Sequence, residues 1–204
     1  MTKTSVLVSL LVAVVMVAGS FYVFTRSSNE PKNVEALLEN SVEKRMGLTL
    51  SSSAFENDEA IPAKYSCDGK NIHPPFTVQG VPEGTGSLVL VMDDPDIPDE
   101  IKKSRGIEKF NHWVVYNIPA DTTSIEEGAT VGTAGLNSAN TLGYRGPCPP
   151  PEYEPSEHRY VFRLFAIKGT LTFEKEPTLD EVETAARGNM LEGAALIGRY
   201  DRSR

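Results

Sequence analysis

The stretch 159–167, RYVFRLFAI, is the longest strand-like run in residues 48–204, because aromatic and β-branched residues fill it almost completely. Such residues favour β-strands. A second run, SLVLVM at 87–92, is nearly continuously apolar, which is typical of a strand buried on both faces. HWVVYNI at 112–118 is a third run of the same kind. Together these segments predict a mainly β body.

The segments around these runs complete the fold prediction. Residues 171–173, which follow a turn at 168–169, are expected to pair with the long strand. Thr178 and Glu181 have the spacing of a capping box, so a helix is expected to begin there. An apolar stripe at helical spacing continues it to about residue 197 through Val182, Ala186, Met190, Ala194 and Ile197. Many strands and one late helix predict a β-sandwich with a peripheral and C-terminal helix, not alternating βαβ units.

The N-terminus has a different character. Residues 4–24 contain no charge, with Lys3 before them and Arg26 after them. Twenty-one helical residues span roughly 31 Å, about one hydrocarbon core. We therefore expect residues 1–26 to form one transmembrane helix that anchors a single-pass membrane protein with an extracytoplasmic body. A signal cleaved near Ala18-Gly19-Ser20, giving a secreted protein, and a buried helix are the alternatives.

Residues 27–47 mix charges of both signs and are expected to form a linker, either a solvated tether or a short amphipathic helix with Val34, Leu37, Leu38 and Val42 at helical spacing, which leaves 48–204 as the folded domain. The whole chain has a net charge of −8, and the domain holds the acidity. An acidic body has no electrostatic footprint for nucleic acid, so we expect no nucleic-acid partner. The 40% hydrophobic content excludes a disordered chain and a multi-pass membrane protein.

Polar groups that packing does not require collect in four segments. They are DDPDIP at 93–98, HW at 112–113, GYRGPCPPP at 143–151 and HRY at 158–160. Prolines stiffen the first and third segments, and strand alternation sends His158 and Tyr160 to one face and Arg159 to the other. Each segment alone also has an ordinary explanation: a solvated turn, a core histidine, a rigid surface loop or a polar strand entry.

The order and spacing of these motifs are more specific than any one of them. DPDxP after a strand, HW opening a strand, a GYxGPxPP loop and HRY opening another strand resemble the phosphatidylethanolamine-binding protein family, in particular its prokaryotic, Raf-kinase-inhibitor-like branch. YSCDG at 65–69, PP at 74–75 and GVP at 80–82 match that branch too. The resemblance covers residues 48–200 and does not include the N-terminal segment.

The resemblance implies a β-sandwich with a C-terminal helix and a small surface pocket for phosphate-type anions, including phospholipid headgroups. It also implies the residues of this pocket: Asp94, His112 and His158 in its lining, Asp96 and Tyr160 close by, and Gly146 and Pro147 as a wall. Asp94 could keep His112 or His158 protonated, and a charged imidazole donates strongly to an anion. Since carboxylates repel anions, a partly protonated phosphate or a zwitterionic headgroup is expected to bind better than a dianion.

Three functions compete. The leading hypothesis is a membrane-tethered binding module that is not an enzyme and uses no cofactor. The second, implied by the resemblance, is a kinase or serine-protease inhibitor that acts by protein–protein contact. The third is a hydrolase that uses Asp94, His112 and His158. A metal site on these three residues is a weaker alternative, because no CxxC or HExxH spacing supports it.

The chain contains two cysteines, Cys67 and Cys148. In an exported body they could form a disulfide that links the CDG segment to the proline loop. The alternative is a nucleophilic Cys148 with His112 or His158 as its base, although no oxyanion device is evident beside it.

Overall fold

The computed structural model describes residues 14–17, 20–23, 47–152 and 154–202. The chain divides into two units, residues 1–40 and 41–204, and the second unit contains the folded body.

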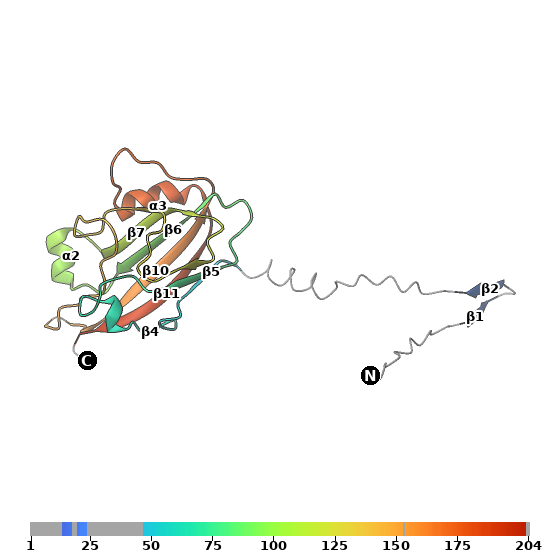
Figure 1. Cartoon of the computed structure of the whole chain (residues 1–204), viewed down its shortest axis with the longest axis horizontal. Helices are drawn as coiled ribbons and strands as arrows, with labels where there is room; N and C mark the ends of the chain where they lie inside the picture. Colours follow the sequence, from blue (N-terminus) through green and yellow to red (C-terminus); the bar gives the residue numbers. More distant parts are fainter. Residues whose placement is uncertain (1–13, 18–19, 24–46, 153, 203–204) are drawn as a thin grey trace, which may run out of the picture. The chain divides into compact units, whose positions relative to one another are not determined.

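A six-stranded sheet forms the larger layer of the body (Figure 1). Its strands, in spatial order, are β4 (Glu59–Ala60), β11 (Met190–Asp201), β10 (Glu157–Ile167), β6 (Ser87–Asp94), β7 (Phe110–Pro119) and β9 (Thr133–Ala134). All neighbours are antiparallel except β4, which pairs parallel to β11. The long aromatic run is therefore a central strand, paired on both sides.

A three-stranded sheet of β3 (Thr49–Ser51), β5 (Phe76–Gln79) and β8 (Ser124–Ile125) forms the smaller layer. The main core includes buried apolar side chains from both sheets, such as Leu50 and Val78 from the smaller and Leu164 from the larger. The ring centroids of Phe76 and Phe162 lie 5.1 Å apart across this core. The two-layer β architecture agrees with the prediction.

The other face of the large sheet is covered by helix α3 (Leu179–Arg187) (Figure 1). Leu179, Val182 and Ala186 of the helix share a second apolar cluster with Val89 and Val91 of β6. Strand β6 is thus buried on both faces, which confirms the expectation from its continuous apolar run. A 3-10 turn (Ala63–Tyr65) and helix α2 (Asp99–Arg105) complete the body.

The predicted C-terminal helix is wrong beyond Arg187. The capping box of Thr178 and Glu181 is present, but the helix ends at Gly188 and the chain returns as β11. Leu196, Gly198 and Tyr200 are buried and alternate with more exposed residues, so the period there is two. Met190, Ala194 and Ile197 fit helical spacing, but backbone pairing with β10 along the whole strand stabilises the extended conformation instead. Met190, expected on the apolar stripe, is exposed.

The predicted pairing of residues 171–173 with the long strand is also wrong. The backbone of Leu171 instead hydrogen-bonds to the side chain of Asn117, whose Nδ2–H donates to the Leu171 carbonyl at 2.8 Å and whose Oδ1 accepts from the Leu171 amide at 2.8 Å. Leu171 packs in the cluster beneath α3. The side-chain amide thus satisfies the backbone groups that a strand partner would have satisfied.

The predicted N-terminal transmembrane helix does not agree with the described part of that segment. Val14–Val17 (β1) and Ser20–Val23 (β2) are short antiparallel strands. Both are rich in β-branched or aromatic residues, which favour strands. None of the helices in the described residues has the length and apolar character needed to cross a bilayer. The rest of residues 4–24, and residues 27–46 of the predicted linker, lie outside the described part.

Candidate functional site

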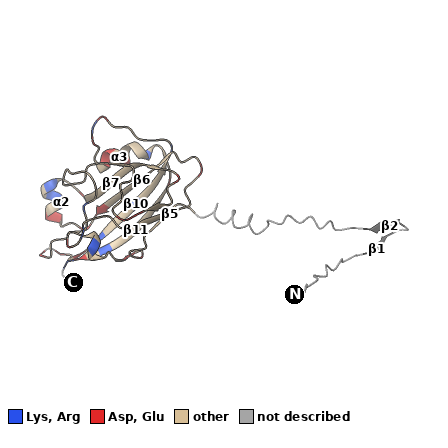
Figure 2. Ribbon diagram, in the orientation of Figure 1, with Lys and Arg blue, Asp and Glu red and all other residues tan. Residues whose placement is uncertain are grey.

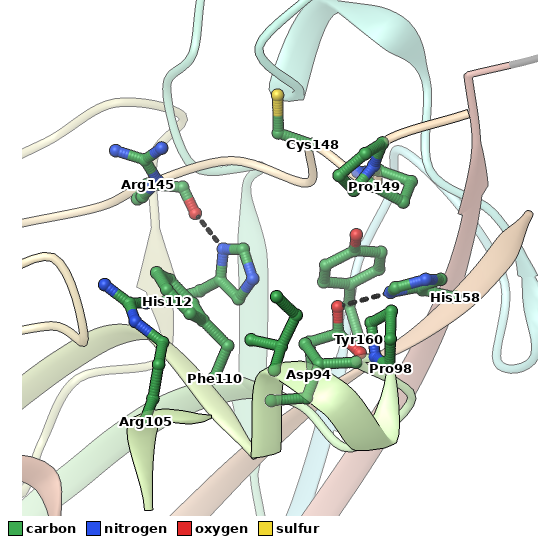
Figure 3. Close-up of a pocket in the computed structure, with 13 residues that line it drawn as sticks. Asp94, Pro98, Arg105, Phe110, His112, Arg145, Cys148, Pro149, His158 and Tyr160 are labelled. Carbon is green, nitrogen blue, oxygen red and sulfur yellow. Dashed lines mark hydrogen bonds and ion pairs between the residues drawn. The ribbon is translucent and has the colours of Figure 1, made fainter. Parts of the chain in front are cut away.

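A cavity of about 200 Å³ lies at one end of the large sheet (Figure 3). Strand β6 runs antiparallel to both β7 and β10, so its last residues meet the first residues of its two neighbours. This topology brings DPDxP, HW and HRY together. The lining consists of Asp94, Ile97, Pro98, Ile101, Arg105, Phe110, His112, Arg145, Cys148, Pro149, Pro150, His158 and Tyr160.

Asp94 and His158 form a buried pair on one side of the cavity. His158 Nδ1–H donates to Asp94 Oδ2 at 2.6 Å, and the two side chains are 1% and 4% exposed. Burial opposes the charged imidazole, but the hydrogen bond and the charge of Asp94 outweigh it and raise the pKa of His158. The carbonyl of Pro155 also favours the charged ring, although Nε2 has no partner in hydrogen-bond geometry among the described residues.

Asp96 stands outside the cavity lining. Its carboxylate accepts from Arg159 Nε at 2.8 Å, Arg159 Nη2 at 2.6 Å and the Arg159 amide at 2.9 Å, which lowers the pKa of Asp96. Its own amide donates to Asp94 Oδ1 at 2.8 Å. Asp96 therefore positions Asp94 and the start of β10. Arg159 is exposed while His158 and Tyr160 are buried, so the predicted alternation of the HRY segment is confirmed.

His112 is held by the backbone of the proline loop. Its Nδ1 lies 2.8 Å from the Arg145 carbonyl, and the Arg145 amide donates to the His112 carbonyl at 3.0 Å. Burial lowers the pKa of His112 to about 4, with Asp94 opposing the shift. The ring is therefore neutral at pH 7, with the proton on Nδ1 and a lone pair on Nε2, which points into the cavity (Figure 3). Asp94 raises the pKa of His158, as one of the two alternatives expected, whereas burial outweighs the effect of Asp94 on the pKa of His112.

Tyr160 packs against both histidines, with its ring edge-on to His112 at 5.2 Å between centroids. Its side chain is fully buried, and burial raises the pKa of the phenol, so Tyr160 stays neutral. The hydroxyl points toward Cys148 and Pro149 (Figure 3). The Cys148 amide lies close enough to favour the phenolate, but the hydroxyl has no hydrogen-bond partner among the described residues.

Gly146 and Pro147 lie behind the wall of the cavity, one step from the residues that line it. The Gly146 amide donates to Asn71 Oδ1 at 2.7 Å, and the Pro147 carbonyl accepts from the Cys67 amide at 3.0 Å. Cys67 and Cys148 form a disulfide, with 5.5 Å between their Cα atoms. These bonds attach the proline loop to the CDG segment, and Arg145, Cys148, Pro149 and Pro150 make the wall.

We expect Gly146→Ala to displace this loop and destabilise the fold, because a Cβ at Gly146 would lie 2.4 Å from the Tyr65 carbonyl oxygen. The expected destabilisation is about 1–3 kcal/mol, as for overpacking in a tight site. Gly188→Ala is the matched control, since its Cβ would meet nothing within 4 Å and its backbone is αR. Denaturant unfolding of both variants checks the prediction, which fails if the two lose the same stability.

The sequence did not predict the arginines of the lining. The guanidinium carbons of Arg105 and Arg145 lie 5.8 and 6.0 Å from the centroid of the Phe110 ring. Neither guanidinium forms an ion pair with another described residue. Arg105 ends α2, whose basic residues gather at its C-terminal end (Figure 2). The sequence does carry a signal for this helix: Pro98 precedes it, Asp99 and Glu100 lie in its first turn, and Gly106 follows its last residue.

Comparisons with known proteins agree with the motifs. The family model described as Phosphatidylethanolamine-binding protein matches residues 51–201. A UPF0098 protein of Methanothermobacter thermautotrophicus is 40% identical over 76% of this chain and 99% of its own length. A UPF0098 protein of Chlamydia pneumoniae is 40% identical over 76% of this chain and 100% of its own length.

Two solved structures share the fold. The putative phosphatidylethanolamine-binding protein homologue CT736 of Chlamydia trachomatis is 36% identical, with a TM-score of 0.69 over 76% of this chain and 98% of that one. YbcL of E. coli, titled a new member of the mammalian PEBP family, is 26% identical, with a TM-score of 0.67 over 76% and 99% of the two chains. The chain therefore belongs to the phosphatidylethanolamine-binding protein family.

Proposed function

We propose that this binding protein takes up a phosphate-type anion, free or as the headgroup of a phospholipid, in the cavity between Asp94, His112 and Tyr160. The observation that carries the proposal is the pair of arginines Arg105 and Arg145, which belong to the lining of a small cavity and whose guanidiniums, beside the Phe110 ring, have no carboxylate partner in the described residues. Arginine is suited to phosphate because its planar fork donates two parallel hydrogen bonds.

The size of the cavity supports a headgroup and not a whole lipid. Its volume of about 200 Å³ is below the usual range of small-molecule sites, which begins at about 300 Å³. Ile97, Ile101 and the prolines of the lining leave few polar atoms for further contacts. A phosphate with a short substituent matches this volume, and the acyl part of a lipid would remain outside.

We further propose that the site binds and does not catalyse. The polar groups that a hydrolase would need have other partners: Asp94 is bonded to His158, and His112 Nδ1 to a backbone carbonyl instead of a carboxylate. Cys148, the nucleophile of one alternative, is in a disulfide. The disulfide also supports an exported body, because such bonds persist in oxidising compartments.

Calorimetric titration of the full-length protein with inorganic phosphate at about pH 6, at constant ionic strength, tests the proposal. We expect saturable binding to a single site. We expect His112→Asn to weaken it about tenfold or more, because the amide can still donate to the Arg145 carbonyl but places no acceptor at Nε2. An unchanged melting temperature of that variant is the control. Absence of saturable binding by the parent protein would overturn the proposal.

A further inference from the structure

The charges of the cavity lining are unevenly placed. In the Asp94–His158 pair the carboxylate accepts the imidazole N–H and favours the protonated ring, so the pair presents no net positive charge to an anion. Tyr160 and His112 are neutral. Positive charge therefore remains only on Arg105 and Arg145, around the ring of Phe110. An anion in this cavity would be neutralised from the arginine side alone.

The arginines donate hydrogen bonds, whereas His112 Nε2 needs a hydrogen-bond donor. His112 Nε2 points into the cavity and carries a lone pair, because Nδ1 holds the ring proton for the Arg145 carbonyl (Figure 3). A fully ionised phosphate or a sulfate has only acceptors, and its oxygens would meet this lone pair and the nearby charge of Asp94. An oxygen that still carries a proton would donate to Nε2 instead. The P–OH of such a ligand and the lone pair on His112 Nε2 are therefore complementary.

We propose that the site selects a phosphate monoester in its singly protonated form: the P–OH donates to His112 Nε2, and the ionised oxygens accept from Arg105 and Arg145. This inference rests on the proposed function and narrows its ligand class. It separates a phosphomonoester from a phosphodiester headgroup, whose phosphate has no proton to donate. No bond is made or broken, and the proton stays on the ligand.

The pH dependence of affinity is expected to come from the ligand's own protonation. The charge of His112 is set by the groups that surround it. These are Asp94 on β6, His158 and Tyr160 on β10, Arg145 on the proline loop and Arg105 on α2. Asp94 favours a charged His112, whereas burial and the other cations oppose it. The second pKa of a phosphomonoester is about 6, so its protonated fraction falls about tenfold for each pH unit above that value. The affinity of the site for a phosphomonoester should fall in proportion to this protonated fraction.

Titrations of the full-length protein with methyl phosphate, dimethyl phosphate, glycerophosphoethanolamine and sulfate between about pH 5 and pH 8 test the inference. For methyl phosphate we expect about 50-fold weaker binding at pH 8 than at pH 6, from the loss of the monoanion. At pH 6, dimethyl phosphate and sulfate, which carry no proton in this range, should bind at least about tenfold more weakly than methyl phosphate, and their affinities should not follow the second pKa of a phosphomonoester.

Other outcomes have definite meanings. If dimethyl phosphate binds as well as methyl phosphate, the inference fails and the proposed function stands. If sulfate binds more tightly toward pH 5, a histidine of the lining, His112 or His158, takes up the proton instead of the ligand, and the inference fails too. If glycerophosphoethanolamine alone binds, an ammonium is the donor and the inference is again overturned. If none of the ligands binds, the proposed function fails.

Variants separate the two contacts. Arg105→Gln and Arg145→Gln should each weaken methyl phosphate about tenfold while keeping its pH profile. Arg187→Gln is the matched control for Arg105→Gln, because both arginines are the exposed last residues of a helix and Arg187 is outside the cavity lining. His112→Asn should flatten the pH profile and remove the preference over dimethyl phosphate. A steep profile in His112→Asn would contradict the inference.

Discussion

Replacing Cys67 and Cys148 together by serine should lower the melting temperature of the body by about 12 °C. The disulfide closes a loop with a sequence separation of 81 residues. In the chain-entropy account, a cross-link over such a loop stabilises the folded state by about 4 kcal/mol. For a domain of this size, each kcal/mol corresponds to about 2–4 °C. Differential scanning calorimetry of the two proteins measures the change directly.

The same variant should bind phosphate several-fold more weakly, about fivefold, because Cys148 lines the cavity and its loop supplies the carbonyl that holds His112. The parent protein with reductant is the control: it should behave as the variant does, and the variant should not respond to reductant. If the parent is equally stable with and without reductant, the cysteines do not contribute as a disulfide. If stability falls and affinity does not, the loop keeps its position without the bond.

Asp93→Asn should destabilise the fold by about 3–5 kcal/mol, the cost of breaking a buried ion pair by removal of one partner. The Asp93 side chain is 4% exposed and contacts Arg163 Nη2, with Lys109 Nζ at 3.2 Å. Glu183 of α3 completes the cluster, at 2.9 Å from Arg163 and 3.7 Å from Lys109. Without the Asp93 charge, one carboxylate would face two cations. Urea unfolding of the full-length protein measures the loss.

Asp121→Asn is the matched control, since Asp121 is exposed in a turn, and we expect it to change stability by less than about 0.5 kcal/mol. The variant Arg163→Met with Asp93→Asn tests the mechanism. If the cost comes from uncompensated charge, the double variant should be more stable than the sum of the single losses implies. Additive losses would show that Asp93 and Arg163 act independently.

The two neighbouring aspartates show how far sequence reasoning could go. Strand alternation predicts that Asp93 and Asp94 point to opposite faces, and in the structure Asp93 faces the ion cluster with α3 while Asp94 faces the cavity. Their spacing alone does not say which one faces a pocket. The family motif, and not the local spacing, marks Asp94 as the residue of the proposed site. Two adjacent aspartates look alike in the sequence, and only the register of the sheet determines which of them faces the cavity.

By itself, the sequence determined what depends on neighbouring residues: the long aromatic strand, the doubly buried strand, the capping box at Thr178 and the alternation of the HRY segment. Tertiary structure decided the rest. Residues 190–201 became a strand because β10 offered a partner along their whole length. The pair of Asp94 and His158 spans 64 residues of sequence. The neutral state of His112 and the placement of Arg105 depend on burial and on packing between distant segments, and these exist only once the sheet has formed.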